Sequence, residues 1–294
     1  MVSGYLPYLQ IIKNQVQIVL QDFSGKLGAC ILLFFVLLAL FAPVIAPNDP
    51  FKVYSREDGS LAKMDPPSSK HWFGTTHYAR DVFNQTIWGS RVAILIGFLS
   101  AFSVTLIGTV IGLISGYYGG KIDDLLMRLT DIAYGIPFLP LCILLVAILK
   151  PSIWNILLAI ILLFWRTTAR VIRSQVLSLK ERPFIWSAKA TGAGDLRILF
   201  VHIAPNVLPL SLLYLALGVG WGVMTEASLS FLGLGDPMKI SWGGMLYDAF
   251  QMAAMRTAWW WILPPGISIA LFVVSVFLLG RSYEEIVNPR LREP

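Results

Sequence analysis

Long apolar runs separated by polar segments dominate this chain of 294 residues. A helix needs about twenty mostly apolar residues to cross a bilayer, and four runs meet that requirement: 28–46, 92–115, 207–231 and 259–279. Two further runs, 132–149 and 153–165, are separated by the polar "KPS", and the first contains two prolines. We interpret them as two helices, the second continuing into "RTTARVIR". The pattern therefore predicts an all-α membrane protein with six spanning helices.

The basic residues test this count, because cytoplasmic segments carry an excess of lysine and arginine. The segment 166–197 holds seven such residues, and the tail adds Arg281, Arg290 and Arg292. The first long loop is also basic, but long loops translocate largely regardless of charge. Six helices put both termini in the cytoplasm with the arginine-rich segment, whereas five would place the tail on the opposite side.

This topology divides the chain into five parts. They are a cytoplasmic N-terminal segment (1–27), a first transmembrane helix (28–46), an extracytoplasmic loop (47–91), a five-helix core (92–280) and a cytoplasmic tail (281–294). Lys13 and Lys26 precede the first apolar run, and no small-residue cleavage pattern follows it. We therefore expect that run to stay as a membrane anchor.

Composition agrees with lipid as the solvent. The chain is 56% hydrophobic and 14% charged, whereas a soluble domain carries about a quarter charged residues. The basic residues are scattered with no aromatic–basic platform, which argues against nucleic acid as a partner. Cys30 and Cys142 lie inside apolar runs, so we expect two small buried hydrophobic residues. Neither they nor the three histidines have metal-site spacing, and no bound metal is expected.

Two spans carry regularly spaced glycines. Gly108, Gly112, Gly116 and Gly120 recur every four residues and form a ridge without side chains, against which another helix can pack closely. "GVGWG" (218–222) has poor helix propensity, and its glycines could bring two backbones together or line a pathway. Helix packing is the favoured interpretation of both.

The segment 183–206, "PFIWSAKATGAGDLRILFVHIAPN", is too polar to span and too patterned to be a slack linker. Pro183 suits the first turn of a short helix, which Gly192 and Gly194 can end in left-handed conformations. Asp195 is a natural N-cap for a second helix, "LRILFVHI", which we expect Pro205 to terminate. The insert is predicted to be a rigid helix–turn–helix on the cytoplasmic face.

Two roles fit this insert. A protein partner could press against the first helix along its small residues, Ser187, Ala188, Ala190 and Gly192. Alternatively, Trp186 and Lys189 could rest the helix on the bilayer surface. The residues alone leave both roles open.

The insert resembles the "EAA" coupling segment of permease subunits in bacterial-type ABC importers. That pattern has an EAA triplet, a glycine after three residues, and a later I-x-L-P element. The matching positions here are Trp186, Ser187, Ala188, Gly192, His202, Ile203, Ala204 and Pro205. Trp186 replaces the glutamate of this pattern, Ser187 the first alanine and Ala204 the leucine.

Other segments strengthen the resemblance. "FGTTHYARDVFNQTIWGSRVAILIG" (73–97) is similar to the "LGTDxxGRDxxxRxxxGxRxSL" block of the dipeptide/oligopeptide/nickel permeases, with Thr76 for Asp and Ala79 for Gly. "GYYGGKIDDLLMRLTD" (116–131), "TEASLSFLGLG" (225–235) and "SWGGML" (241–246) resemble later blocks of the same family. The resemblance covers roughly residues 28–290 and is greatest to the second permease of each pair.

The resemblance implies the type I ABC importer permease fold and a division of labour. A related permease would complete the pathway, a substrate-binding protein would dock outside, and two partner ATPases would hydrolyse ATP with Mg. This chain lacks a G-x-x-x-x-G-K-[ST] loop, so it is expected to bind no cofactor itself and not to be an enzyme. The residues expected at the ATPase contact are Trp186, Ser187, Ala188, Ala190, Gly192, Ala193 and Asp195.

Two rival classes remain to be weighed. "GAGD" and "GLGD", ending at Asp195 and Asp236, and the "YD" at Asp248 are similar to motifs of intramembrane aspartyl proteases, but their order differs and no PAL motif occurs. A self-sufficient secondary transporter would place ionisable groups at membrane depth, where Glu226 is the firm candidate and Asp131 a marginal one. We favour a structural partner for Glu226.

The cargo is not defined by these residues. Di- or oligopeptides are the favoured solute, and a nickel complex, glutathione or an oligosaccharide are the alternatives that the family offers. The candidates for the pathway lining are Thr225, Glu226, Gly218, Gly222 and Trp242.

Overall fold

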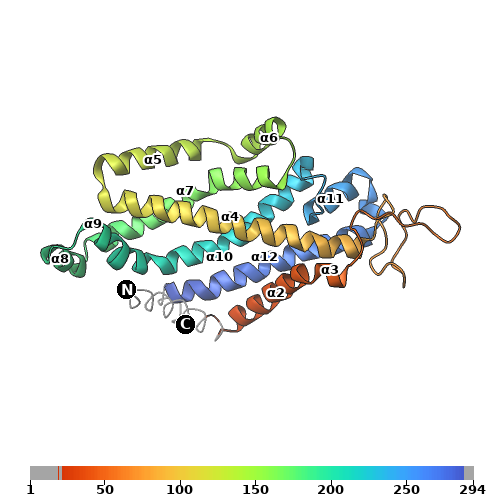
Figure 1. Ribbon diagram of the computed structural model, residues 1–294, viewed down its shortest axis with the longest axis horizontal. Helices are drawn as coiled ribbons and strands as arrows, with labels where there is room; N and C mark the ends of the chain where they lie inside the picture. Colours follow the sequence, from red (N-terminus) through yellow and green to blue (C-terminus); the bar gives the residue numbers. More distant parts are fainter. Residues whose placement is uncertain (1–18, 20–21, 288–294) are drawn as a thin grey trace.

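The computed structural model describes Val19 and residues 22–287, and it shows an elongated bundle of helices (Figure 1). Within that part of the chain, five helices are long and apolar enough to cross a membrane. They are α2 (Phe23–Leu40), α4 (Val82–Tyr118), α7 (Ile153–Lys180), α10 (Ala204–Leu229) and α12 (Trp259–Val287). Most of the predicted N-terminal segment lies outside the described residues, as do residues 288–294 of the predicted tail, whereas residues 281–287 of that tail are part of α12.

A bent pair of helices supplies the sixth candidate span. α5 (Gly120–Gly135) and α6 (Phe138–Leu149) meet at an angle of 81°. Pro137 lies between the two helices and has no N–H to continue the hydrogen bonding of α5. It also disfavours helical backbone at the preceding residue, Ile136, which is extended at ψ 119°. Because α4 and α7 run in the same direction, the chain between them must return along the bundle. The run 132–149, which we predicted to be one spanning helix, is thus divided between α5 and α6, and the described chain has five spans, or six if this bent pair crosses the membrane as one broken span.

The direction of α4 relative to α7 follows from the glycine ridge. A Cβ at Gly108 would lie 2.6 Å from Thr168 Cβ, one at Gly112 would lie 2.7 Å from Ala169 O, and one at Gly116 would lie 2.7 Å from Val176 Cβ. Glycines further along α4 contact residues further along α7, so the two helices run parallel to each other. The packing interpretation is confirmed for these three glycines.

Gly120 is the exception on the ridge. Its φ is +52° and a Cβ there would meet nothing within 4 Å, so it serves the turn between α4 and α5. In the "GVGWG" stretch, a Cβ at Gly222 would lie 2.3 Å from Ser100 Oγ and 3.3 Å from Gly97 Cα. That close approach of α10 to α4 confirms the packing interpretation there too.

The helix boundaries correct two predicted parts of the chain. The first span ends at Leu40, and a separate turn α3 (Ala42–Ile45), with Pro43 near its start, follows. α4 begins at Val82 instead of residue 92, so the loop is shorter than predicted. Its first turns looked like loop because they are polar, but Asp81 caps the helix and the amide of Asn84 donates to Asn48 O at 2.9 Å.

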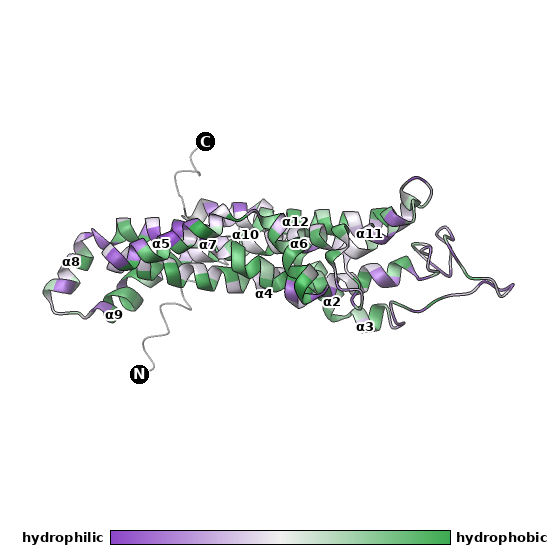
Figure 2. Ribbon diagram, turned by 90° about the horizontal axis from the view of Figure 1, so that it is seen from above, coloured by the Kyte–Doolittle hydropathy of each residue, from purple (hydrophilic) through white to green (hydrophobic). Residues whose placement is uncertain are grey.

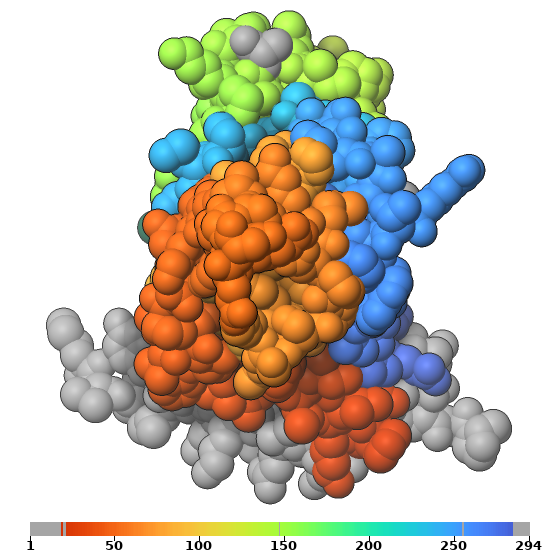
Figure 3. All heavy atoms as spheres, turned by 90° about the vertical axis from the view of Figure 1, so that its right-hand side faces the viewer, coloured from red at the N-terminus to blue at the C-terminus, as the bar shows by residue number. Residues whose placement is uncertain are grey.

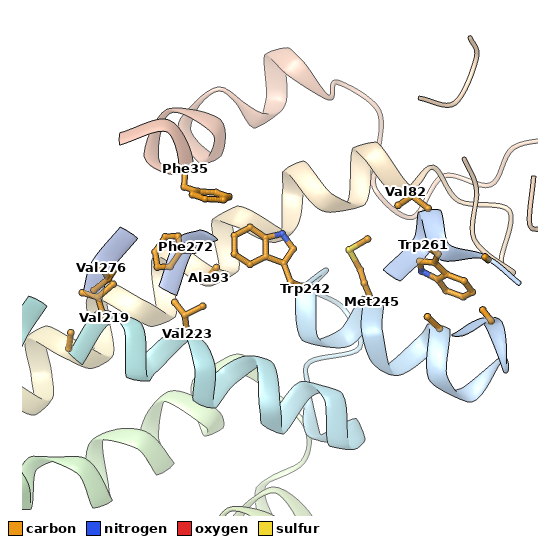
Figure 4. Close-up of a cluster of buried hydrophobic side chains, with 14 residues drawn as sticks. Phe35, Val82, Ala93, Val219, Val223, Trp242, Met245, Trp261, Phe272 and Val276 are labelled. Atoms are coloured by element: carbon orange, nitrogen blue, oxygen red, sulfur yellow. The ribbon is translucent and has the colours of Figure 1, made fainter. Parts of the chain in front are cut away.

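The main core lies between α2, α4, α10, α12 and α11 (Trp242–Gln251) (Figure 4). Phe35 packs edge-on against Trp242 and Phe272, with ring centroids 5.5 and 5.6 Å apart. Apolar residues predominate along the long helices (Figure 2). Many of their large side chains are exposed, including Phe34 and Leu40 on α2 at 57% and 68% exposure. Such an apolar exterior fits lipid as the surrounding solvent. Cys142 is buried as expected, whereas Cys30 is exposed on this exterior.

The two ends of the bundle differ. α8 (Pro183–Ala190) and α9 (Asp195–Arg197) project at one end, which we call the α8 end (Figure 1). The start of α2 and the end of α12 also lie toward that end. The loop 47–81 covers the opposite end, the loop end, beside α11 and the start of α12 (Figure 3).

Candidate coupling site and pathway

α8 is a short helix held at the α8 end by one buried side chain. Pro183 is in its first turn, and Ile185 is fully buried in a cluster that includes Ile172 and Val176 of α7. Ala188 packs against the same cluster from the outside. An isolated helix of this length is marginal in water, so tertiary packing must hold α8 in place.

The turn after α8 depends on one glycine. Gly192 has φ +82°, and the N–H of Ala193 donates to Ala188 O at 3.0 Å, which closes the end of the helix. Gly194 has φ −68°, so the predicted left-handed conformation is wrong for that residue. It is the N-cap of α9 and leads the chain back in an extended conformation.

Asp195 has a different role from the predicted N-cap. It is the first residue of α9, and its Oδ1 accepts a hydrogen bond of 2.7 Å from the Tyr117 hydroxyl at the end of α4. The ammonium group of Lys189 lies 5.8 Å from the Tyr117 ring centroid. Tyr117 thus ties both arms of the insert to α4, and no local sequence signal pointed to it.

Pro205 does not end a helix, as the sequence had suggested. α9 continues through a π-helical segment η1 (Ile198–Ile203) directly into α10, where Pro205 lies in the first turn. Pro205 has no N–H to donate to the preceding turn, and that turn is a π turn, in which hydrogen bonds run five residues back. The insert is therefore continuous with the next long helix.

The seven residues expected at a coupling contact lie in α8, in the following turn and at the start of α9, all at the α8 end. Trp186, Ser187, Ala190, Gly192 and Asp195 are exposed, while Ala188 and Ala193 are half-buried. Trp186 is 58% exposed and Leu196, which the sequence did not single out, is 67% exposed. The α8 end thus presents a small, partly apolar projection, residues 183–197, which the buried Ile185 fixes to the bundle and which we call the α8 knob.

The five pathway candidates separate into two groups. Gly218 and Gly222 line a cavity of about 300 Å³ between α4, α7 and α10. Thr225, Glu226 and Trp242 are 8%, 2% and 1% exposed and lie inside the chain. Their burial argues against a pathway-lining role.

Glu226 and Trp242 have partners within the chain. The Ser230 hydroxyl donates to Glu226 Oε1 at 2.6 Å, and the Trp242 indole N–H donates to Thr86 O at 2.9 Å. Ser230 is therefore a structural partner of the kind that we favoured for Glu226. A Cβ at Gly89 would lie 2.7 Å from the Trp242 ring, which gives that glycine of the loop block a packing role as well.

The loop end is folded around the remaining residues of that block. Asp81 caps α4 through Asn84 N at 2.8 Å and contacts His71 Nδ1 at 2.7 Å. Arg56 Nε lies 3.1 and 3.0 Å from the two carboxylate oxygens of Asp65, and this guanidinium lowers the pKa of Asp65. The loop is thus a built surface and not a slack connection.

The arginines of α7 are paired with α5. Arg173 holds Asp123 through Nε at 2.6 Å and Nη2 at 2.5 Å, and Arg170 pairs with Asp131. The Tyr134 ring centroid lies 3.9 Å from the Arg170 guanidinium. These contacts keep the amphipathic α5 on α7.

The two GxGD aspartates, Asp195 and Asp236, lie far apart from each other, and Asp248 of the "YD" lies on α11. Asp195 lies at the α8 end, bonded to Tyr117. Asp236 follows the π segment η2 (Ser230–Leu234), accepts from Met238 N at 2.9 Å, and lies 3.4 Å from Ile153 N at the start of α7. Both have structural partners at positions far apart in the bundle.

The long apolar helices define a multi-pass membrane protein. The model of the family "Binding-protein-dependent transport system inner membrane component" matches residues 108–293, and that of the "N-terminal TM domain of oligopeptide transport permease C" matches residues 24–67. The chain belongs to this permease family, as its sequence motifs had indicated. It is an inner-membrane subunit of an ABC importer, a transport component and not an enzyme.

Particular relatives agree with this assignment. The chain is 37% identical to the dipeptide transport system permease protein DppC of Alkalihalophilus pseudofirmus, over 97% of this chain and 89% of the relative. It is 37% identical to the oligopeptide transport system permease protein OppC of Bacillus subtilis, over 92% of this chain and 88% of the relative. A solved structure of the MetNI methionine ABC transporter, inward facing, matches with a TM-score of 0.54 at 19% identity, covering 70% of this chain and 95% of that chain. This likeness supports the type I importer permease fold.

Proposed function

We propose that this subunit moves short peptides across the membrane and that α8 couples the movement to ATP hydrolysis by partner proteins. The observation that carries the coupling is the α8 knob, an exposed helix fixed to the bundle by the fully buried Ile185. A helix held in this way moves with α7 and α10, whereas a slack loop would not. Force applied to α8 would therefore reach the spanning helices.

The proposal includes an orientation for the chain. Arg182, Lys189 and Arg197 are exposed at the α8 end, and an excess of basic residues is typical of cytoplasmic segments. With the α8 end in the cytoplasm, both chain ends would lie there and the folded loop would face outward. Two ATPases using ATP and Mg would receive the coupling residues, Trp186 to Asp195, and a substrate-binding protein would meet the loop end.

The peptide cargo rests on the relatives. Both permeases compared above carry dipeptide or oligopeptide transport in their names, and they align over nearly the whole chain. A second, related permease would complete the pathway, since one bundle presents only one side of it. Neither of these two names mentions a nickel complex, glutathione or an oligosaccharide.

Gly192→Glu tests the coupling role. Gly59 in the loop is the matched control, because the two glycines have φ +82° and +81° and neither would place a Cβ within 4 Å of another residue. Both substitutions cost about 1–2 kcal/mol of left-handed strain. We expect Gly192→Glu to abolish peptide uptake and weaken co-purification of the ATPases, with membrane insertion intact, and Gly59→Glu to retain the ATPases. Equal ATPase recovery and uptake in both variants would refute the coupling role.

A further inference from the structure

The cavity between α4, α7 and α10 has a volume of about 300 Å³ and lies halfway along the three helices. Val104, Phe164, Gly218 and Trp221 form part of its apolar wall. Small-molecule sites have volumes from about 300 Å³ upward and are mostly apolar, with a few placed polar groups. This cavity has that size and that character.

Polar side chains line part of the cavity, and one of them connects it to further polar groups outside. Thr167 and Tyr214 line it, and the Thr167 hydroxyl lies 3.1 Å from the Tyr134 hydroxyl of α5. The Tyr134 ring is flanked by the guanidinium groups of Arg166 and Arg170, at 4.5 and 3.9 Å from its centroid. A chain of contacts therefore leads from the apolar cavity to a cluster of charges.

Those charges are accessible and of both signs. Arg170 pairs with Asp131, and their side chains are 45% and 63% exposed. Exposed pairs of this kind are weak and open readily to other partners. A zwitterion with an apolar side chain would find an apolar wall, hydroxyl groups and charges of both signs along this path.

We infer that this cavity is a subsite of the transport pathway that accepts the apolar side chain of a short peptide. The Asp131–Arg170 pair, which Tyr134 and Thr167 connect to the cavity, meets the charged peptide termini, Arg170 the carboxylate and Asp131 the ammonium group. The inference rests on the proposed peptide cargo and deepens it. It assigns this subunit a direct part in selecting among peptides, beyond the choice made by the binding protein.

Val104→Phe, which fills the cavity, tests the inference in proteoliposomes that hold the complete transporter. The matched control is Val110→Phe on the same helix, where the side chain is 45% exposed and does not line the cavity. Uptake of leucyl-leucine and of glycyl-glycine is measured with the same binding protein. We expect the ratio of the two rates to fall about tenfold or more in Val104→Phe and to stay unchanged in Val110→Phe, since misfit in an apolar pocket costs one to two decades.

A second variant keeps the inference testable if Val104→Phe does not assemble. Trp221→Ala removes a half-exposed side chain from the wall, and it should raise the uptake of phenylalanyl-phenylalanine relative to glycyl-glycine. Ratios that do not change in either variant, while peptide uptake persists, would overturn the cavity assignment and leave the proposed function standing. A wild-type transporter that takes up none of the three peptides would overturn both.

Discussion

Truncation of the α8 anchor, Ile185→Ala, is the sharpest test of a rigid knob. The Ile185 side chain is fully buried, and replacing a buried isoleucine with alanine costs about 2–5 kcal/mol. Because eight residues cannot maintain a helix alone, this loss should fall on α8 itself. At 1.4 kcal/mol per decade, the amides of α8 should lose protection from hydrogen exchange by about thirty- to several-thousand-fold.

The matched control is Leu196→Ala in the same insert. Leu196 is 67% exposed, so its truncation should change the protection of α8 by less than about 0.5 kcal/mol. Exchange measured by mass spectrometry on the purified transporter reports both variants. In the anchor variant, ATP hydrolysis should also lose its dependence on the loaded binding protein. Unchanged protection of α8 in Ile185→Ala would refute the argument that this side chain fixes the knob.

Three further predictions concern the helix packing and the loop end. Gly112→Val should prevent α4 from packing on α7 and abolish folded protein in detergent, whereas Gly266→Ala, with nothing within 4 Å of its Cβ, should purify normally. Arg56 lowers the pKa of Asp65, so the pair stabilises the fold above about pH 4 and this stabilisation is lost as the pH falls further. In Arg56→Gln, the melting temperature measured by tryptophan fluorescence should therefore fall less between neutral and acidic pH than it does in the wild type. Burial raises the pKa of Asp248, so this carboxyl destabilises the folded state at any pH at which it is ionised in the unfolded chain. Asp248→Asn should therefore have a higher melting temperature than the wild type at pH 7, and no higher one below about pH 4. The argument for Arg56 would be contradicted if the melting temperature of Arg56→Gln fell as much on acidification as that of the wild type. The argument for Asp248 would be contradicted if Asp248→Asn melted at a lower temperature than the wild type at pH 7.

The apolar runs predicted the spans well because lipid demands long apolar helices. They failed where polar groups are satisfied inside a helix. Asn84 and Thr86 look like loop residues, but their side chains bond to Asn48 O and Val82 O, and so α4 begins ten residues early. The break at Pro137 was visible as a proline, whereas its angle depends on the packing of α5 on α7.

The site was predictable only in its local parts. Pro183 and Gly192 carry backbone preferences that any sequence shows, and both serve the turns expected of them. The contact of Tyr117 with Asp195 joins residues far apart in the chain, so no spacing rule could find it. Trp242 was placed near the pathway by its motif, but its burial depends on the surrounding core residues Phe35 and Phe272.

Photo-crosslinking from α8 tests the central claim most directly. A photoreactive residue at Trp186, which is 58% exposed, would be activated in membranes that contain the assembled transporter. We predict a covalent product with an ATPase subunit, and none with the ATPases from the same probe at Trp72, which is 67% exposed at the loop end. Products with lipid alone from position 186, in every nucleotide state, would contradict the coupling role of α8.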